Sequence, residues 1–129
     1  MRKKILVVDD DADWVELISF NLKKAGFLIG TASNGIDALK KARSLGPDLI
    51  LLDLKLPELD GFAVCETLRR NSATASIPII ILTAVSGEIA RITGMECGAT
   101  EYVTKPSSPK RLVSRVENLL RHTTDNQPS

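Results

Sequence analysis

The sequence predicts an α/β fold in which a parallel sheet of five strands is covered by helices on both faces. Apolar segments alternate five times with amphipathic helical patterns over 129 residues, a length that suits one domain. Three of the apolar segments are continuous instead of alternating, which is typical of strands buried on both faces. We therefore expect a doubly wound (βα)5 domain with right-handed crossover connections.

The expected strands are short apolar segments bounded by polar or turn-forming residues. The first follows a basic N-terminus, and its brief apolar run ends at three aspartates, which indicates a first strand and not a signal peptide. The third is the most apolar part of the chain. The expected strands span residues 4–8, 28–32, 49–52, 77–82 and 101–104.

A helical pattern follows each expected strand, because apolar residues recur at spacings of three and four. The expected helices span residues 12–25, 35–45, 60–70, 87–97 and 109–121. Two of their apolar stripes are Trp14, Leu17, Ile18 and Leu22 in the first helix and Ile89, Ile92 and Met95 in the fourth. We expect the domain to cover residues 1–122, with residues 123–129 as a disordered tail or the start of a linker.

The composition narrows the classes of function. The 17 basic and 16 acidic residues leave a net charge of +1, which does not predict binding to nucleic acid or to a membrane by this domain. No segment reaches the ~18 apolar residues of a membrane span. Cys65 and Cys97 lack a CxxC or metal-ligand spacing, so we expect free thiols in a reducing compartment and a cytoplasmic protein.

Side chains suited to binding a cation or a phosphoryl group follow the first, third, fourth and fifth expected strands. In the flavodoxin-like strand order 2-1-3-4-5, strands one, three and four are central neighbours, and ligands bind at the carboxyl ends of the strands. These polar residues are Asp9, Asp10 and Asp11 after the first strand, Asp53 after the third, Thr83 after the fourth and Lys105 after the fifth. We therefore expect carboxylates, a hydroxyl and an ammonium to meet at one edge of the sheet.

Carboxylates gathered in a small site repel one another unless a cation binds there. Mg²⁺ binds to a few carboxylates, keeps several waters and is often completed by phosphate oxygens. A lysine and a threonine hydroxyl add a positive charge and a donor for a transferring phosphoryl group. Asp53 is then a metal ligand, a carboxylate nucleophile or both, although each residue taken alone also fits a helix cap or a solvated surface position.

The chain resembles the receiver domain of two-component response regulators, as in the bacterial chemotaxis regulator. The resemblance extends from Lys4 to about Arg121. It depends on four motifs in this order: ILVVDDDADW, PDLILLDLKLPELDGF, IPIIILTA and GATEYVTKP. It implies that Asp53 is the phosphoacceptor and that Mg²⁺ is held by Asp10, Asp53 and the backbone carbonyl of Lys55, with Asp9 acting through water.

The resemblance also implies a switch. Thr83 and Lys105 would bind phosphoryl oxygens, and Tyr102 would turn inward when Thr83 moves to the phosphoryl group. The Lys105–Pro106 peptide bond is expected to be cis. Phosphorylation would then change the face formed by the fourth helix, fifth strand and fifth helix. Such a domain assists its own phosphorylation and dephosphorylation but is not an enzyme in its own right.

Partners also follow from the resemblance. The phosphoryl donor would be a phosphohistidine on a histidine kinase or a phosphotransfer protein, and Phe20, on the side of the first helix opposite its apolar stripe, is a candidate contact. A homodimer would use the fourth helix, fifth strand and fifth helix, with Arg91, Glu101 and Arg115 as candidate ion-pair residues. The chain is expected to be a stand-alone receiver or the N-terminal domain of a transcriptional regulator.

Two other classes remain open on the sequence. A phosphohydrolase of the haloacid-dehalogenase type also uses an aspartate nucleophile and Mg²⁺, but it leaves Asp53 without a role. A pseudo-receiver would bind partners without phosphorylation, but no residue of the acidic pocket is missing here. Thr100 and Ser107 depart from the usual residues of receiver domains and leave the output surface and the kinetics open.

Overall fold

The computed structural model describes residues 2–125, with side chains described for residues 2–121. One parallel sheet has the order β2-β1-β3-β4-β5, which confirms the predicted fold class and strand order. The strands are β1 (Lys4–Val8), β2 (Leu28–Ala32), β3 (Leu49–Leu52), β4 (Ile79–Thr83) and β5 (Glu101–Thr104). The helices are α1 (Ala12–Lys24), α2 (Gly35–Leu45), α3 (Gly61–Arg70), α4 (Glu88–Glu96) and α5 (Pro109–Asp125).

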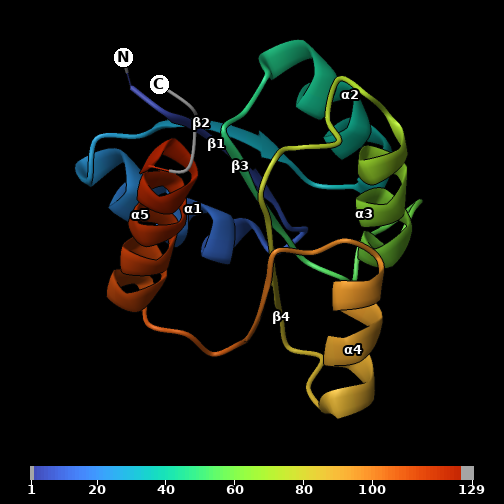
Figure 1. Cartoon of the computed structure of the whole chain (residues 1–129). Coiled ribbons are helices and arrows are strands. Elements are labelled where there is room, and N and C mark those ends of the chain that lie inside the picture. The colour runs from blue at the N-terminus through green and yellow to red at the C-terminus, as the bar shows by residue number, and fades with distance from the viewer. Residues whose placement is uncertain (1, 126–129) are drawn as a thin grey trace.

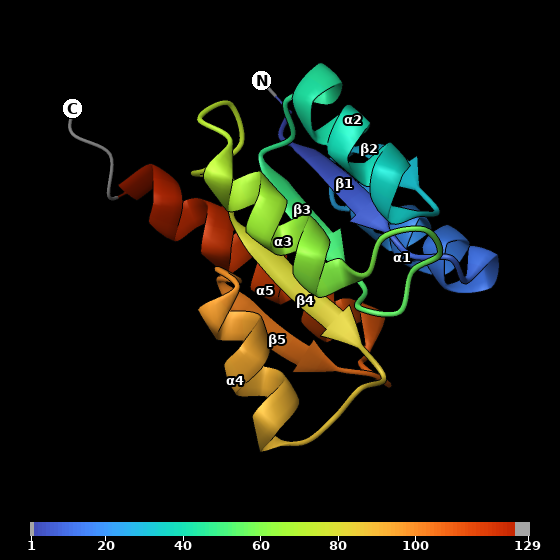
Figure 2. The same ribbon diagram turned by 90° about the vertical axis from the view of Figure 1, so that its right-hand side faces the viewer.

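Helices cover both faces of the sheet (Figure 1). The pair α1 and α5 lies on one face, and α2, α3 and α4 lie on the other, as the second view shows (Figure 2). Alternate residues of the central strands point into two separate cores. Leu6 and Ile50 belong to the core under α2 and α3, whereas Ile5 and Leu51 belong to the core under α1 and α5. Burial on both faces explains why these strands are continuously apolar.

Side-chain caps determine where three of the helices begin. Asp11 precedes α1 and accepts hydrogen bonds from the backbone N–H groups of Asp13 and Trp14. Asp60 caps α3 in the same way, by accepting from the N–H of Ala63. Such caps satisfy N–H groups that have no partner within the helix. The Asp11 carboxylate therefore serves as a helix cap, which distinguishes Asp11 from its neighbours Asp9 and Asp10.

Some element ends differ from the sequence prediction. Strand β4 begins at Ile79, two residues after the predicted start, because the intervening Pro78 has no N–H for a ladder. Thr83 is the last residue of β4 and does not follow it. Helix α5 continues to Asp125 and does not end at Arg121. The rest of the predicted tail, residues 126–129, lies outside the described residues.

The predicted burial of the apolar stripe on α4 is wrong. Ile89 is 84% exposed, and Ile92 and Met95 are also exposed. The buried residue of this helix is Gly94, where an added Cβ would lie 2.9 Å from a ring carbon of Tyr102. Because α4 approaches the sheet through a glycine, its larger apolar side chains remain at the surface.

The stripe predicted for α1 is partly wrong. Ile18 and Leu22 are fully buried, but Leu17 is 47% exposed and the small Ser19 is buried instead. Within residues 2–125, none of the helices is both long and apolar enough to span a bilayer. Cys65 and Cys97 are free thiols, as predicted.

Candidate functional site

The carboxyl edge of the sheet brings together side chains that are distant in sequence. Asp9 follows β1 and Asp53 follows β3, and these two strands are paired so that Val8 lies opposite Leu52. Lys105 follows β5, and Thr83 ends β4. The parallel arrangement therefore places these residues at one edge, as the sequence predicted.

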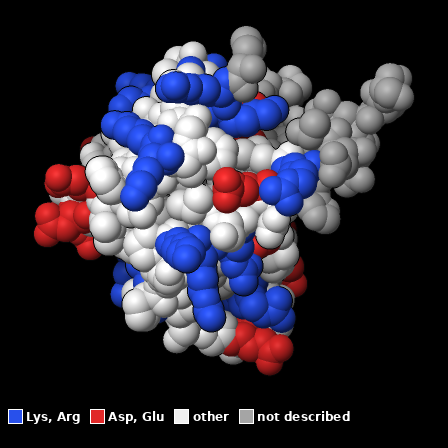
Figure 3. Space-filling model, turned by 90° about the vertical axis from the view of Figure 1, so that its left-hand side faces the viewer, with Lys and Arg blue, Asp and Glu red and all other residues white. Residues whose placement is uncertain are grey.

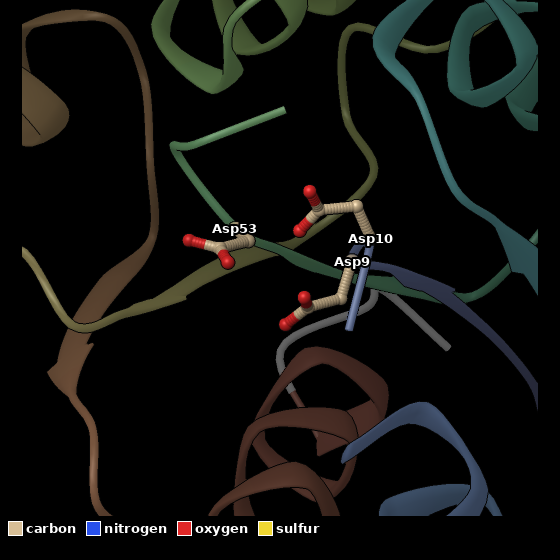
Figure 4. A group of neighbouring side chains, drawn as sticks. All are labelled: Asp9, Asp10 and Asp53. Atoms are coloured by element: carbon tan, nitrogen blue, oxygen red, sulfur yellow. The ribbon is translucent and has the colours of Figure 1, made fainter. Parts of the chain in front are cut away.

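Three carboxylates form the centre of the site. Carboxylate oxygens of Asp9, Asp10 and Asp53 all lie within 4.8 Å of one another. Figure 4 shows that the three side chains point into the same space. Asp9 and Asp53 are buried, with exposed fractions of 4% and 8%, whereas Asp10 is exposed. A cation at this place would therefore meet two buried ligands and one open to solvent.

Backbone N–H groups hold the buried carboxylates in place. Asp53 Oδ1 accepts hydrogen bonds from the N–H of Leu54 at 2.7 Å and from that of Lys55 at 3.4 Å. Asp9 Oδ1 accepts from the N–H of Asp11 at 3.0 Å. These bonds compensate for part of the cost of burying a charged group. They leave the second oxygen of each carboxylate directed at other partners.

Lys105 connects the two buried carboxylates. Its Nζ lies 2.5 Å from Asp9 Oδ2 and 3.4 Å from Asp53 Oδ2. Burial raises the pKa of Asp9, the hydrogen bonds from Lys105 and Asp11 partly oppose this, and the charge of Asp53 raises it further. Burial alone would lower the pKa of Lys105, but its hydrogen bond to Asp9 and the charge of Asp53 prevail and raise it. One ammonium thus serves two carboxylates, which leaves the cluster with excess negative charge.

Thr83 and Tyr102 are linked through the backbone of Val85. The fully buried Thr83 accepts a hydrogen bond on Oγ1 from the N–H of Val85 at 3.3 Å. The Tyr102 hydroxyl donates to the carbonyl of Val85 at 2.6 Å. A movement of the Thr83 hydroxyl would therefore break its hydrogen bond with the Val85 N–H. The Val85 backbone, to which Tyr102 is hydrogen-bonded, would then be held less firmly.

The backbone at the site has two further features. The Lys105–Pro106 peptide bond is cis. The loop between β3 and α3 packs closely on Gly61, where an added Cβ would lie 2.3 Å from the carbonyl oxygen of Asp53. In the sequence Gly61 ends a run of polar and turn-forming residues, which is the signal that marks such a loop.

The residues proposed for interfaces lie on the surface. Phe20 is 64% exposed on α1. Arg115 pairs with Glu101 at 2.6 Å within the chain, and Arg91 lies 3.9 Å from Glu88. Thr100, one of the departures noted above, exchanges two hydrogen bonds with Ile79 at the start of β4. Thr100 therefore connects β4 to the segment before β5 through both its backbone N–H and its hydroxyl.

Sequence analysis missed the contact of Trp14 with Lys105. The Lys105 Nζ lies 5.4 Å from the centroid of the Trp14 ring. In the sequence Trp14 was assigned to the apolar stripe of α1, which gave no sign of an ammonium partner 91 positions away. One indication of this contact was present in the sequence: Trp14 comes directly after the acidic cluster, where the start of α1 lies at the carboxyl edge of the sheet.

The donor set fits a divalent cation that prefers oxygen ligands. Three carboxylates in one space, two of them buried and only partly balanced by Lys105, form a site of the kind that Mg²⁺ occupies. Lys55 comes two residues after Asp53, so its backbone carbonyl is close in sequence to the acidic cluster. The site can therefore hold a metal ion and present a carboxylate nucleophile beside it.

Comparisons with known proteins agree with this geometry. Residues 5–117 match the family model of the response regulator receiver domain. The chain is 46% identical over 129 residues to the alkaline phosphatase synthesis transcriptional regulatory protein PhoP of Bacillus subtilis, covering 100% of this chain and 53% of PhoP. It is 45% identical over 120 residues to the DNA-binding dual master transcriptional regulator RpaA of Synechocystis, covering 93% of this chain and 50% of RpaA.

A solved structure is also similar. The receiver domain of the Francisella response regulator 1452 has a TM-score of 0.88 and 32% identity, covering 95% of this chain and 99% of that one. The chain spans about half the length of the curated relatives that it matches. The match to receiver domains over most of the chain leaves the haloacid-dehalogenase alternative without support.

Proposed function

The chain belongs to the response regulator receiver family, and on this premise we propose that it is a phosphorylation-dependent switch with Asp53 as phosphoacceptor. The phosphoryl donor is a phosphohistidine on a histidine kinase or a phosphotransfer protein, and the exchange takes place in the cytoplasm. The observation that carries the proposal is the buried Asp53 carboxylate, which shares one site with two other carboxylates and an ammonium.

The transfer needs the phosphoryl donor, a divalent cation and groups that the chain supplies. An oxygen of the Asp53 carboxylate attacks the phosphorus, the P–N bond of the phosphohistidine breaks, and its electron pair returns to the imidazole. Mg²⁺, when bound by Asp10, Asp53 and the Lys55 carbonyl, with Asp9 acting through water, supplies positive charge to the phosphoryl oxygens. Lys105, whose Nζ lies 3.4 Å from Asp53 Oδ2, contributes a second positive charge.

The switch follows from the two bonds at Val85. The Thr83 hydroxyl moves to donate to a phosphoryl oxygen, and this movement breaks the hydrogen bond that its Oγ1 accepts from the Val85 N–H. The loop after β4 then shifts, and Tyr102 exchanges its bond to the Val85 carbonyl for a position closer to the core. Phosphorylation favours one of two arrangements of the face formed by α4, β5 and α5.

The test is intact-mass analysis after incubation with acetyl phosphate and Mg²⁺. The wild-type chain should gain the mass of one phosphoryl group, and the gain should disappear with EDTA and in Asp53→Asn. Asp13→Asn is the matched control, because Asp13 is an exposed aspartate on α1. An adduct that persists in Asp53→Asn would refute the assignment, and absence of an adduct also with a phosphohistidine donor would favour a pseudo-receiver.

The donor protein is proposed to bind beside α1. The face that carries α1 and α5 shows more Lys and Arg than Asp and Glu side chains (Figure 3), so a partner with acidic groups fits it. Phe20 adds an exposed aromatic side chain to α1. Phe20→Ala should slow transfer from a histidine kinase without slowing transfer from acetyl phosphate, and equal rates from the kinase would remove Phe20 from the contact.

A specific observation also favours the homodimer. Ile89, Ile92 and Met95 form an exposed apolar strip on α4, next to β5. In such a dimer Arg115 and Glu101, which pair within the chain here, would exchange partners across the interface. Size-exclusion chromatography with light scattering should show dimers after phosphorylation, and a monomer at all concentrations would contradict this. RpaA is named a DNA-binding transcriptional regulator, and this chain covers 50% of it, so we also propose that the receiver is attached to a DNA-binding output domain.

A further inference from the structure

The immediate surroundings of Lys105 include an aromatic ring. Trp14 stands in the first turn of α1, half-buried, and packs against the core under α1 and α5. Its ring lies beneath the Lys105 ammonium, with 5.4 Å from Nζ to the centroid. The same ammonium contacts Asp9 and Asp53. Lys105 is thus attracted by two carboxylates and by the face of one aromatic ring.

Space is available on one side of this lysine. A cavity of about 330 Å³ is lined by Asp11, Trp14, Ala84, Lys105 and Pro106. A lysine side chain has four flexible carbons and many rotamers, so an adjacent cavity gives it alternative positions away from the carboxylates. Trp14 borders this cavity and also lies beside Asp9 and Asp53. The indole ring therefore adjoins both the open space and the acidic cluster.

We propose that Trp14 is a positioning residue, which holds the Lys105 ammonium beside Asp53 through its ring face. This inference rests on the proposed function, because it assigns a role in the same phosphoryl transfer. A cation over an aromatic face is attracted by the ring quadrupole, and indole is the strongest of the aromatic side chains in this respect. Loss of the ring face should lower the equilibrium constant between the placed and the displaced lysine by about two- to fivefold.

The first experiment compares Trp14→Phe with Trp14→Leu. Both variants keep an apolar side chain in the core, but only phenylalanine keeps an aromatic face. With acetyl phosphate and saturating Mg²⁺, Trp14→Leu should have a maximal phosphorylation rate about two- to fivefold below that of Trp14→Phe, at an unchanged half-saturating acetyl phosphate concentration. Equal maximal rates would overturn the proposal, since a residue that only fills space would treat the two variants alike.

The second experiment needs no phosphorylation. Trp14 is the only tryptophan, so its emission reports on this ring alone. Lys105→Met should change the wavelength or intensity of the emission of the metal-free chain, whereas Lys110→Met, at an exposed position on α5, should not. Unchanged emission in Lys105→Met would overturn the proposal. If the wild-type chain accepts no phosphoryl group at all, the proposed function fails, but this emission test still decides whether the Lys105 ammonium lies on the Trp14 ring.

Discussion

Gly61 offers a direct test of how the β3–α3 loop supports the site. An added Cβ at this position would lie 2.3 Å from the carbonyl oxygen of Asp53 and 2.7 Å from the Cα of Leu54. An ordinary contact begins at 3.4 Å, so this carbonyl must retreat by about 1 Å. Both neighbours are backbone atoms, which cannot rotate away. Gly61→Ala should therefore move the backbone that carries Asp53.

Two quantities should change in Gly61→Ala. Overpacking of this kind costs about 1–3 kcal/mol of unfolding free energy. Displacement of Asp53 and of the neighbouring Lys55 carbonyl should weaken Mg²⁺ binding, roughly tenfold to hundredfold, as loss of supporting contacts does at other metal sites. Urea unfolding measures the first quantity, and Mg²⁺ titration of Trp14 fluorescence measures the second.

Gly46→Ala is the matched control for this prediction. Gly46 has φ 56° and no heavy atom within 4 Å of an added Cβ, so alanine there costs only the left-handed conformation, about 1–2 kcal/mol. It lies at the end of α2, away from the carboxyl edge. The reasoning is refuted if Gly61→Ala and Gly46→Ala bind Mg²⁺ with the same affinity.

Three further predictions concern charge, assembly and thiol reactivity. Folding raises the pKa of Asp9 above 3.8, so the folded chain holds this proton more tightly than the unfolded chain, and metal-free stability rises as the pH falls through the raised pKa. Asp9→Asn should flatten that part of the pH profile of urea unfolding and stabilise the metal-free chain at pH 7; a destabilised variant would contradict the sign. Ile89→Asp should leave the unfolding free energy within about 0.5 kcal/mol, since its side chain is 84% exposed, yet remove any phosphorylation-dependent dimer in light scattering. Burial raises the pKa of the Cys65 thiol to about 11, so at pH 8 an alkylating reagent followed by peptide mass spectrometry should modify Cys97, which is partly exposed, well before Cys65.

The fold could be predicted because its signals are local and repeated. The continuous apolar runs of β1 and β3 indicate burial on both faces, and each helix has its own apolar spacing. The spacing of apolar residues did not predict burial where packing against a neighbouring element decides which side chains are covered. Ile89 has the spacing of a buried residue, but Gly94 brings α4 onto Tyr102 and leaves Ile89 in solvent. The spacing of apolar residues along one helix does not show which side of that helix packs against its neighbour.

The members of the site could be named from the sequence, but their connections could not. Asp53 and Lys105 were singled out because polar residues at the ends of parallel strands share an edge. The sequence alone therefore determined the sheet, the acidic cluster and the candidate nucleophile. Only the tertiary structure decided that Lys105 reaches both Asp9 and Asp53, that Trp14 lies beneath it, and that Val85 links Thr83 to Tyr102. These contacts depend on rotamers and loop paths, which are determined by packing between segments far apart in the chain.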